Sequence, residues 1–143
     1  MATIRIHVDV DRPVENVFAY VADIRNDVHW WRGVISAERL TGDGGPGTEY
    51  AQDTRLFGVR FPARMVVLEV EPPRRFLYRS TDSLTPFTAE YTFTPLTAGR
   101  TRFTMTAELA ATGPFRWFGP VFLPLLRIVA RRYFGSLRTA VPA

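Results

Sequence analysis

The stretch from Val34 to Leu109 constrains the fold most, because turn-forming residues follow every apolar run within it. Glycine, proline and small polar residues recur at 41–47, 57–58, 71–74, 83–86 and 95–99. This spacing is typical of short strands joined by tight connections. None of the connections is long enough to hold a crossover helix, so neighbouring strands are expected to run antiparallel. We therefore predict six antiparallel strands here and exclude a doubly wound parallel sheet.

Before this stretch, the period of the apolar residues changes from two to between three and four. Residues 3–10 alternate isoleucine and valine with polar side chains, which predicts a seventh strand with one buried face. Pro13 suits the first turn of a helix, and the apolar residues of 14–21 recur at helical spacing, which predicts a short amphipathic helix. Asp23 is a good N-cap for a second short helix over 24–31.

A long amphipathic helix is predicted from Gly113-Pro114 to about Ala140, which at roughly 40 Å would cross a whole sheet. Pro120 and Pro124 weaken its first turns. Its predicted inward face comprises Phe115, Phe118, Phe122, Leu125, Leu126, Val129, Tyr133, Leu137 and Ala140. Its predicted outward face mixes Trp117, Val121, Leu123, Ile128 and Phe134 with Arg116, Arg127, Arg131 and Arg138. Such a face suits a homodimer contact or an anionic membrane surface, although scattered exposed apolar side chains are also ordinary.

The composition limits the chemistry available to this chain. With 143 residues and 46% hydrophobic side chains, we expect a single domain, 1–143, with a full core. Cysteine is absent and His7 and His29 are the only histidines, so neither a disulfide nor a metal site is expected. All 18 basic residues are arginines, and against 14 acidic residues they give a net charge of +4. They are dispersed along the chain, so nucleic-acid binding is not expected.

No targeting or membrane-spanning segment is predicted. The first residues alternate apolar and polar side chains, without the apolar block of a signal peptide. The longest uncharged apolar run, 117–126, is interrupted by glycine and proline and is shorter than the ~20 residues of a transmembrane helix. A cytoplasmic location is therefore the default expectation.

Three segments give the chain a family resemblance: Val-Asp-Arg-Pro-Val-Glu-Asn-Val-Phe at 10–18, the run from Asp23 to Trp30-Trp31, and Pro-Pro-Arg-Arg-Phe at 72–76. With the order of predicted elements, they resemble the START-like or helix-grip superfamily (SRPBCC), and within it the polyketide cyclase/dehydrase group. The resemblance covers essentially the whole chain. It implies an α+β helix-grip fold, in which a seven-stranded curved antiparallel sheet wraps around a long C-terminal helix, with two short helices between the first two strands.

The resemblance also implies a space between sheet and long helix that is partly empty, and strand alternation nominates its lining. Tyr91 and Phe93 share one face of their strand, as do Phe103 and Met105. The candidate ligand-binding residues are Trp30, Trp31, Tyr50, Phe61, Tyr78, Tyr91, Phe93, Phe103, Met105, Phe118 and Phe122, with Phe76 on the same expected face. The alternative is that these aromatic side chains fill a solid core.

Three residues are candidates for chemistry: His29, Arg64 and Tyr91. An imidazole beside the cavity could move a proton near neutral pH, but the alternative is that His29 faces water while one neighbouring tryptophan packs under the first helix. Arg64 either faces water or is turned inward by a bulge near Pro62, where it would bind a carboxylate, phosphate or enolate. The aromatase/cyclases that the chain resembles use a buried arginine with tyrosine or tryptophan to polarise a ketone. The segment 66–70 lacks an arginine where their pattern would place one, which argues against cyclase activity.

Asp53 and Glu90 are expected on the solvent face, paired with arginines of neighbouring strands. We therefore carry three functional hypotheses forward. The first is cofactor-free binding of a hydrophobic, aromatic or lipid-like small molecule between the sheet and the C-terminal helix. The second is a polyketide aromatase/cyclase or dehydratase that acts without a cofactor. The third is an interaction module that uses Trp117, Val121 and Ile128 on the outer face of the C-terminal helix.

Overall fold

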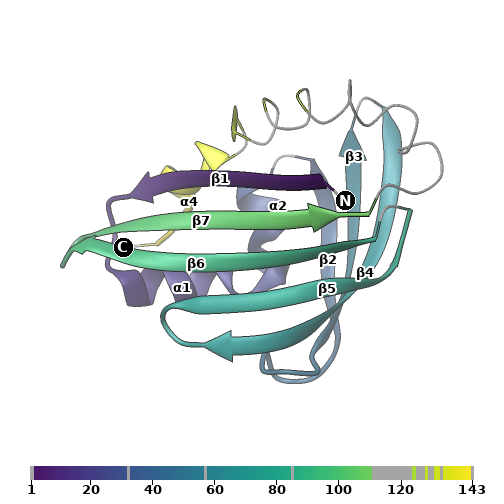
Figure 1. The fold of residues 1–143 in the computed structure, drawn as a ribbon, viewed down its shortest axis with the longest axis horizontal. Helices are drawn as coiled ribbons and strands as arrows, with labels where there is room; N and C mark the ends of the chain where they lie inside the picture. Colours follow the sequence, from purple (N-terminus) through teal and green to yellow (C-terminus); the bar gives the residue numbers. More distant parts are fainter. Residues whose placement is uncertain are drawn as a thin grey trace.

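Seven antiparallel strands form one curved sheet in the computed structural model (Figure 1). The structure describes residues 2–31, 33–56, 58–84, 86–110, 124, 128, 131–132 and 134–142. The strands are β1 (Ala2–Val10), β2 (Val34–Thr41), β3 (Glu49–Leu56), β4 (Val59–Glu71), β5 (Arg75–Ser83), β6 (Phe87–Thr97) and β7 (Arg100–Leu109). Their order across the sheet is β1-β7-β6-β5-β4-β3-β2. The predicted seven-stranded antiparallel sheet is confirmed.

Short helical elements join β1 to β2, as predicted. They are α1 (Val14–Val21), the 3-10 turn η1 (Ile24–Asn26) and α2 (Asp27–Trp30). The buried valines and phenylalanine of α1 face the sheet, and α1 contacts β6 and β7. The Asp23 side chain accepts a hydrogen bond of 3.1 Å from the backbone N–H of Arg25, which caps η1 as expected. Figure 1 shows α1 and α2 behind the sheet, on its concave side.

The predicted long C-terminal helix lies mostly outside the described residues. The backbone is helical at the described positions 124, 128, 131–132 and 134, and α4 (Leu137–Ala140) follows. Gly135 and Ser136 form a turn between Phe134 and α4, so the prediction of one unbroken helix through this point is wrong. Here the Ser136 hydroxyl donates a hydrogen bond to the Trp30 carbonyl, which ties the turn to α2.

Phe134 corrects the predicted faces of this segment. It was expected on the outer face, yet it is only 1% exposed and lies edge-to-face against Trp30 and Trp31. Edge-to-face contacts with the two indoles stabilise the inward position of Phe134, and Leu137 is buried with it. Ile128 is 64% exposed, as predicted, and the described arginines Arg131, Arg132 and Arg138 are exposed too. Trp117 and Val121 lie outside the described residues, so an interaction role for this face stays a prediction.

Aromatic rings fill one end of the concave face. The ring of Phe103 stacks on Phe93 at 5.3 Å and on Phe134 at 5.6 Å between centroids. Trp30 and Tyr91 meet the same ring edge-on at 6.0 and 5.0 Å. This cluster joins β6, β7, α2 and the C-terminal segment, so at this end the solid-core alternative holds.

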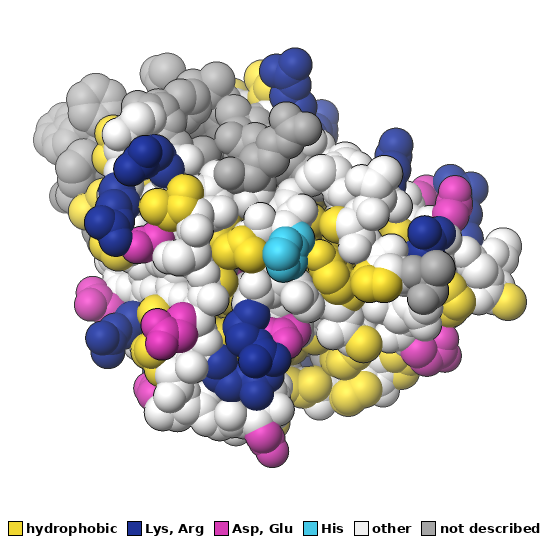
Figure 2. Space-filling view, turned by 180° about the vertical axis from the view of Figure 1, so that it is seen from behind, with side chains coloured by type: hydrophobic (Ala, Val, Ile, Leu, Met, Phe, Trp, Pro, Cys, Tyr) yellow, Lys and Arg dark blue, Asp and Glu magenta, His cyan; other side chains and the backbone are white. Residues whose placement is uncertain are grey.

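Charged pairs cover the convex face. Asp53 pairs with Arg60 of the next strand, and Arg75 pairs with Glu90 at 2.7 Å and with Glu69. The expected outward position of Asp53 and Glu90 is thus confirmed. Figure 2 shows the opposite side of the molecule, seen from behind the view of Figure 1; arginine and carboxylate side chains lie there in small mixed groups, with hydrophobic side chains between them.

Replacing Phe103 by alanine tests the aromatic cluster. Because the ring is fully buried among four aromatic neighbours, Phe103→Ala should lower the free energy of unfolding by about 3–5 kcal/mol in urea titrations. The control is Phe61→Ala, since Phe61 is only half-buried and its loss should cost clearly less. Equal losses in the two variants would contradict the central position of Phe103.

Candidate functional site

A mostly apolar pocket lies on the concave face, between the sheet and α2. It encloses about 180 Å³. Its lining residues are Ile4, Asp27, Trp31, Gln52, Thr54, Tyr78, Phe87, Ala89, Tyr91, Met105, Ala107 and Leu109. Phe87 at the start of β6 pairs with Leu109 at the end of β7, so the pocket lies toward this end of the two strands, beyond the aromatic cluster.

Two alanines explain why this part of the concave face is hollow. Ala89 of β6 and Ala107 of β7 are partners in register, and both are buried. Further along the same face of these strands, Phe93 and Phe103 are also partners in register, and they fill the space with rings. Because two methyl groups stand where that pair carries large side chains, the sheet leaves a cavity there.

Asp27 brings a carboxyl group into this apolar pocket. It begins α2 and is 4% exposed. The side-chain amide of Gln52 donates a hydrogen bond of 2.7 Å to Asp27 Oδ2. Asp27 Oδ1 and the indole Nε1 of Trp30 are buried, and neither makes a well-formed hydrogen bond among the described residues, although the indole N–H is close enough to act on the Asp27 carboxyl.

The surroundings of Asp27 favour its neutral form. Burial is the main cause that raises its pKa from 3.8 to about 8, and the nearby Asp23 carboxylate acts in the same direction. The hydrogen bond from Gln52 acts against this shift, as does the nearby Trp30 indole N–H, without offsetting it. At neutral pH, Asp27 is therefore chiefly a carboxylic acid with an O–H to donate.

Two tyrosine hydroxyl groups supply further polar atoms of the pocket, beside the side chains of Gln52 and Thr54. The hydroxyls of Tyr78 on β5 and Tyr91 on β6 lie 2.8 Å apart, and either one can donate to the other. Burial raises the pKa of both phenols, and negative charge on Asp27 would raise them further. Both groups therefore stay neutral across the physiological pH range.

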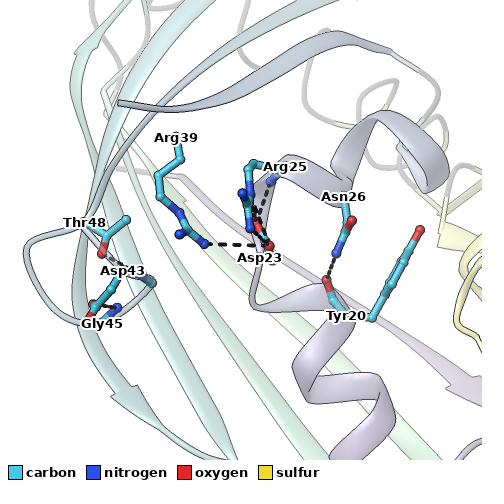
Figure 3. A network of polar contacts seen from close by, with 9 residues as sticks. Tyr20, Asp23, Arg25, Asn26, Arg39, Asp43, Gly45 and Thr48 are labelled. Atoms are coloured by element: carbon cyan, nitrogen blue, oxygen red, sulfur yellow. Dashed lines mark hydrogen bonds and ion pairs between the residues drawn. The ribbon is translucent and has the colours of Figure 1, made fainter. Parts of the chain in front are cut away.

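A polar network fixes residues 23–26, which lead into Asp27 and α2 (Figure 3). The Asp23 carboxylate accepts a hydrogen bond of 2.6 Å from the Arg25 guanidinium and lies 3.9 Å from that of Arg39 on β2. The side-chain amide of Asn26 donates to the Tyr20 carbonyl of α1 at 2.9 Å. These contacts tie η1 to α1 and to β2, and α2 begins at the next residue.

The predicted ligand-binding residues divide into four groups. Trp31, Tyr78, Tyr91 and Met105 line the pocket. Trp30, Tyr50, Phe93 and Phe103 are buried in the core and do not line it, like Phe76. Phe61, near the start of β4, is half-buried and lies beside a separate depression of the surface. Phe118 and Phe122 lie outside the described residues.

Of the three candidates for chemistry, only Tyr91 lies in the pocket. His29 is exposed, as its alternative interpretation held, and it is absent from the described lining. Arg64 is exposed as well: the pairing of β4 with β5 is irregular between Arg64 and Met65, but it is Met65 that points inward. The inward alternative for Arg64 is therefore wrong, and the solvent-facing one is confirmed.

Sequence reasoning missed Asp27 and Gln52, although weak signals for both exist. Asp27 precedes Trp31 by four residues, so one helical turn places the two on a common face. Gln52 alternates with Tyr50 on β3 and therefore shares its inward direction. An aspartate in a first helical turn is ordinary, however, and a single glutamine in a strand carries no functional signal of its own.

Metal and membrane features are missing from the part of the chain that the structure describes. Within it, no three histidine, cysteine, aspartate or glutamate side chains come together as ligands of a metal ion. Nor does any helix among those residues combine the length and apolar character needed to cross a bilayer.

Asp27→Asn tests the buried acid through protein stability. Asp27 takes up a proton on folding between its unfolded pKa of 3.8 and its folded pKa of about 8. Its stabilising contribution is therefore complete below the lower value and declines, by about 1.4 kcal/mol per pH unit, as pH rises toward the upper one. In urea unfolding, the variant should match the wild type near pH 4 and exceed it by a few kcal/mol at pH 7.5. The exposed Asp82 provides the control variant Asp82→Asn, which should follow the wild type; equal pH slopes for all three proteins would contradict the shift.

Comparison with known proteins assigns the fold to a family. The chain resembles a Thermus thermophilus protein of known structure, with 17% identity, a TM-score of 0.84 and coverage of 98% of this chain and 97% of that one. The Zhui aromatase/cyclase from a Streptomyces species follows at 16% identity and a TM-score of 0.77, with 98% and 90% covered. A START superfamily protein from Mycobacterium smegmatis shares 15% identity at a TM-score of 0.72, with 96% and 92% covered. No curated protein sequence matches significantly. The model of one family, described as polyketide cyclase / dehydrase and lipid transport, matches residues 1–141, and the chain belongs to that family.

Proposed function

We propose that this protein binds a hydrophobic, ring-containing small molecule in the pocket between α2 and the sheet. The observation that carries the proposal is the Ala89–Ala107 pair, which leaves a hollow of about 180 Å³ in the concave face. An apolar cavity of about 150 Å³ is enough to bind benzene, so this space suits a single ring with a short substituent.

The chemistry of the lining supports a ligand of this kind. Large apolar side chains from β1, β6, β7 and the end of α2 surround the space, and the polar atoms come from a few side chains. Such a combination of apolar walls and a few placed polar groups is typical of small-molecule sites. The family description names lipid transport beside cyclase activity, which is consistent with a binding role.

Filling the hollow should abolish binding. Ala89→Leu adds three carbon atoms at the centre of the described lining and should lower the affinity for ethylbenzene at least tenfold, measured by calorimetry. Native mass spectrometry should show a co-purified molecule on the wild type and none on Ala89→Leu.

The matched control is Ala37→Leu, at a half-buried position of the edge strand β2 that is absent from the described lining. It should bind like the wild type, and circular dichroism melting should show that all three proteins are folded. A wild type with no retained molecule and no response to ethylbenzene would overturn the proposal.

A cofactor-free aromatase/cyclase or dehydratase is the second candidate, and one observation favours it. A carboxylic acid inside a mostly apolar pocket, beside two neutral phenols, is suited to donate a proton or hydrogen bond to a ketone oxygen as an enolate forms. Tyr91 remains a candidate catalytic residue in this hypothesis. Arg64 and His29 are exposed, and their positions support no catalytic role.

Turnover of a poly-β-ketone separates the two candidates. For an enzyme, Asp27→Asn should slow product formation by about 10²–10⁴-fold while Arg64→Ala leaves it unchanged. If the wild type binds ethylbenzene but forms no cyclised or dehydrated product, the binding function stands without the enzymatic one.

A further inference from the structure

We propose that Asp27 is the specificity-determining residue of this pocket, and that its buried carboxylic acid donates a hydrogen bond to a carbonyl oxygen on an uncharged ring-containing ligand. The inference rests on the proposed binding function and narrows it. It selects neutral oxygen-bearing molecules, such as aryl ketones, from among the hydrophobic compounds that the pocket could hold. It also excludes fatty acids and other anions.

The carboxylic acid of Asp27 lacks an acceptor for its proton among the described residues. The Gln52 amide donates to Oδ2, and the Trp30 indole N–H also acts on the carboxyl as a donor. Oδ1 is buried in a pocket-lining side chain and makes no well-formed hydrogen bond within the described chain, so the O–H of the acid has no acceptor there. Leaving such a group unpaired costs roughly 1–3 kcal/mol, so buried polar atoms are nearly always bonded. A ligand acceptor in the pocket would supply the missing partner.

The charges around the pocket favour an uncharged ligand. No arginine or histidine belongs to its described lining, so an anionic ligand would lose its hydration without gaining a counterion. A cationic ligand would require Asp27 to ionise, and two charges would then be buried among apolar side chains, which seldom repays the cost of removing them from water. A neutral ligand avoids both costs.

The neighbouring elements do not supply a cation either. Four ionisable groups interact electrostatically with the Asp27 carboxyl: Tyr20 of α1, Asp23 before η1, Tyr78 of β5 and Tyr91 of β6. Arg25 and Arg39 lie nearby on η1 and β2, but both are engaged with the Asp23 carboxylate. On α2 itself, His29 points to solvent. Acids and phenols thus surround Asp27 on the described side, which favours its protonated form.

Four single-ring probes of similar size distinguish the possibilities. Calorimetry at pH 6 would compare acetophenone, which carries a carbonyl, with ethylbenzene, benzoate and benzylamine. We expect acetophenone and ethylbenzene to bind, and benzoate and benzylamine to bind at least tenfold more weakly than acetophenone. Either ion binding more tightly than acetophenone would overturn the proposal.

Two variants isolate the hydrogen bond from simple hydrophobicity. In Asp27→Leu, the ratio of acetophenone to ethylbenzene affinity should fall about tenfold, because the donor is lost while the apolar walls remain. In Asp27→Asn, which keeps an N–H donor, the ratio should stay close to that of the wild type. An unchanged ratio in Asp27→Leu would overturn the role of Asp27 while leaving binding in the pocket intact.

The pH dependence provides a readout that a merely structural role would not move. Wild-type affinity for acetophenone should be constant below about pH 7 and fall above about pH 8, as Asp27 loses the proton that it donates. Affinity for ethylbenzene, and that of Asp27→Asn for either probe, should stay level over the same range. If none of the four probes binds the wild type, both this inference and the proposed function fail; a level acetophenone profile in the wild type refutes this inference alone.

Discussion

The stacked rings of Phe93, Phe103 and Phe134 are the contact on which the rest of the structure depends. They join β6 and β7 to the C-terminal segment, and Trp30 extends the same cluster to α2. These rings fill one end of the concave face, and through Trp30 they fix the position of α2 over the sheet. The pocket exists because Ala89 and Ala107, which lie beyond the rings on the same face, are too small to reach across.

Much of the fold was predictable from the sequence, because the signals were local and repeated. Alternating valine and isoleucine marked β1, and turn-forming residues marked the limits of the later strands closely enough to count seven. Phe134 shows where such reasoning fails. Its inward position depends on Trp30 and Trp31, about a hundred residues earlier in the chain, and on the turn at Gly135 and Ser136, which interrupts the helical period.

The candidate site was harder to predict, since it depends on register and burial. Alternation correctly placed Tyr78, Tyr91 and Met105 on the pocket face, but it could not separate them from Phe93 and Phe103, which share that face and lie in the core. That distinction follows from the pairing of Ala89 with Ala107 across two strands. Asp27 illustrates the same limit, because an aspartate that begins a helix ordinarily faces water, and here it is enclosed by Gln52 and the apolar walls.

The tyrosine pair gives the pocket an adaptable wall beside its two alanines, since Tyr78 is the partner of Ala89 in register. The two hydroxyl groups share one hydrogen bond, and either Tyr78 or Tyr91 can be the donor without any heavy atom moving. In one arrangement the second hydroxyl hydrogen points away from the pair and can be donated; rotating both hydrogens reverses the roles. One rigid cavity can therefore present its hydroxyl groups in more than one pattern, so that ligands with different arrangements of oxygen atoms can be accommodated by rotating a bond rather than by repacking a core.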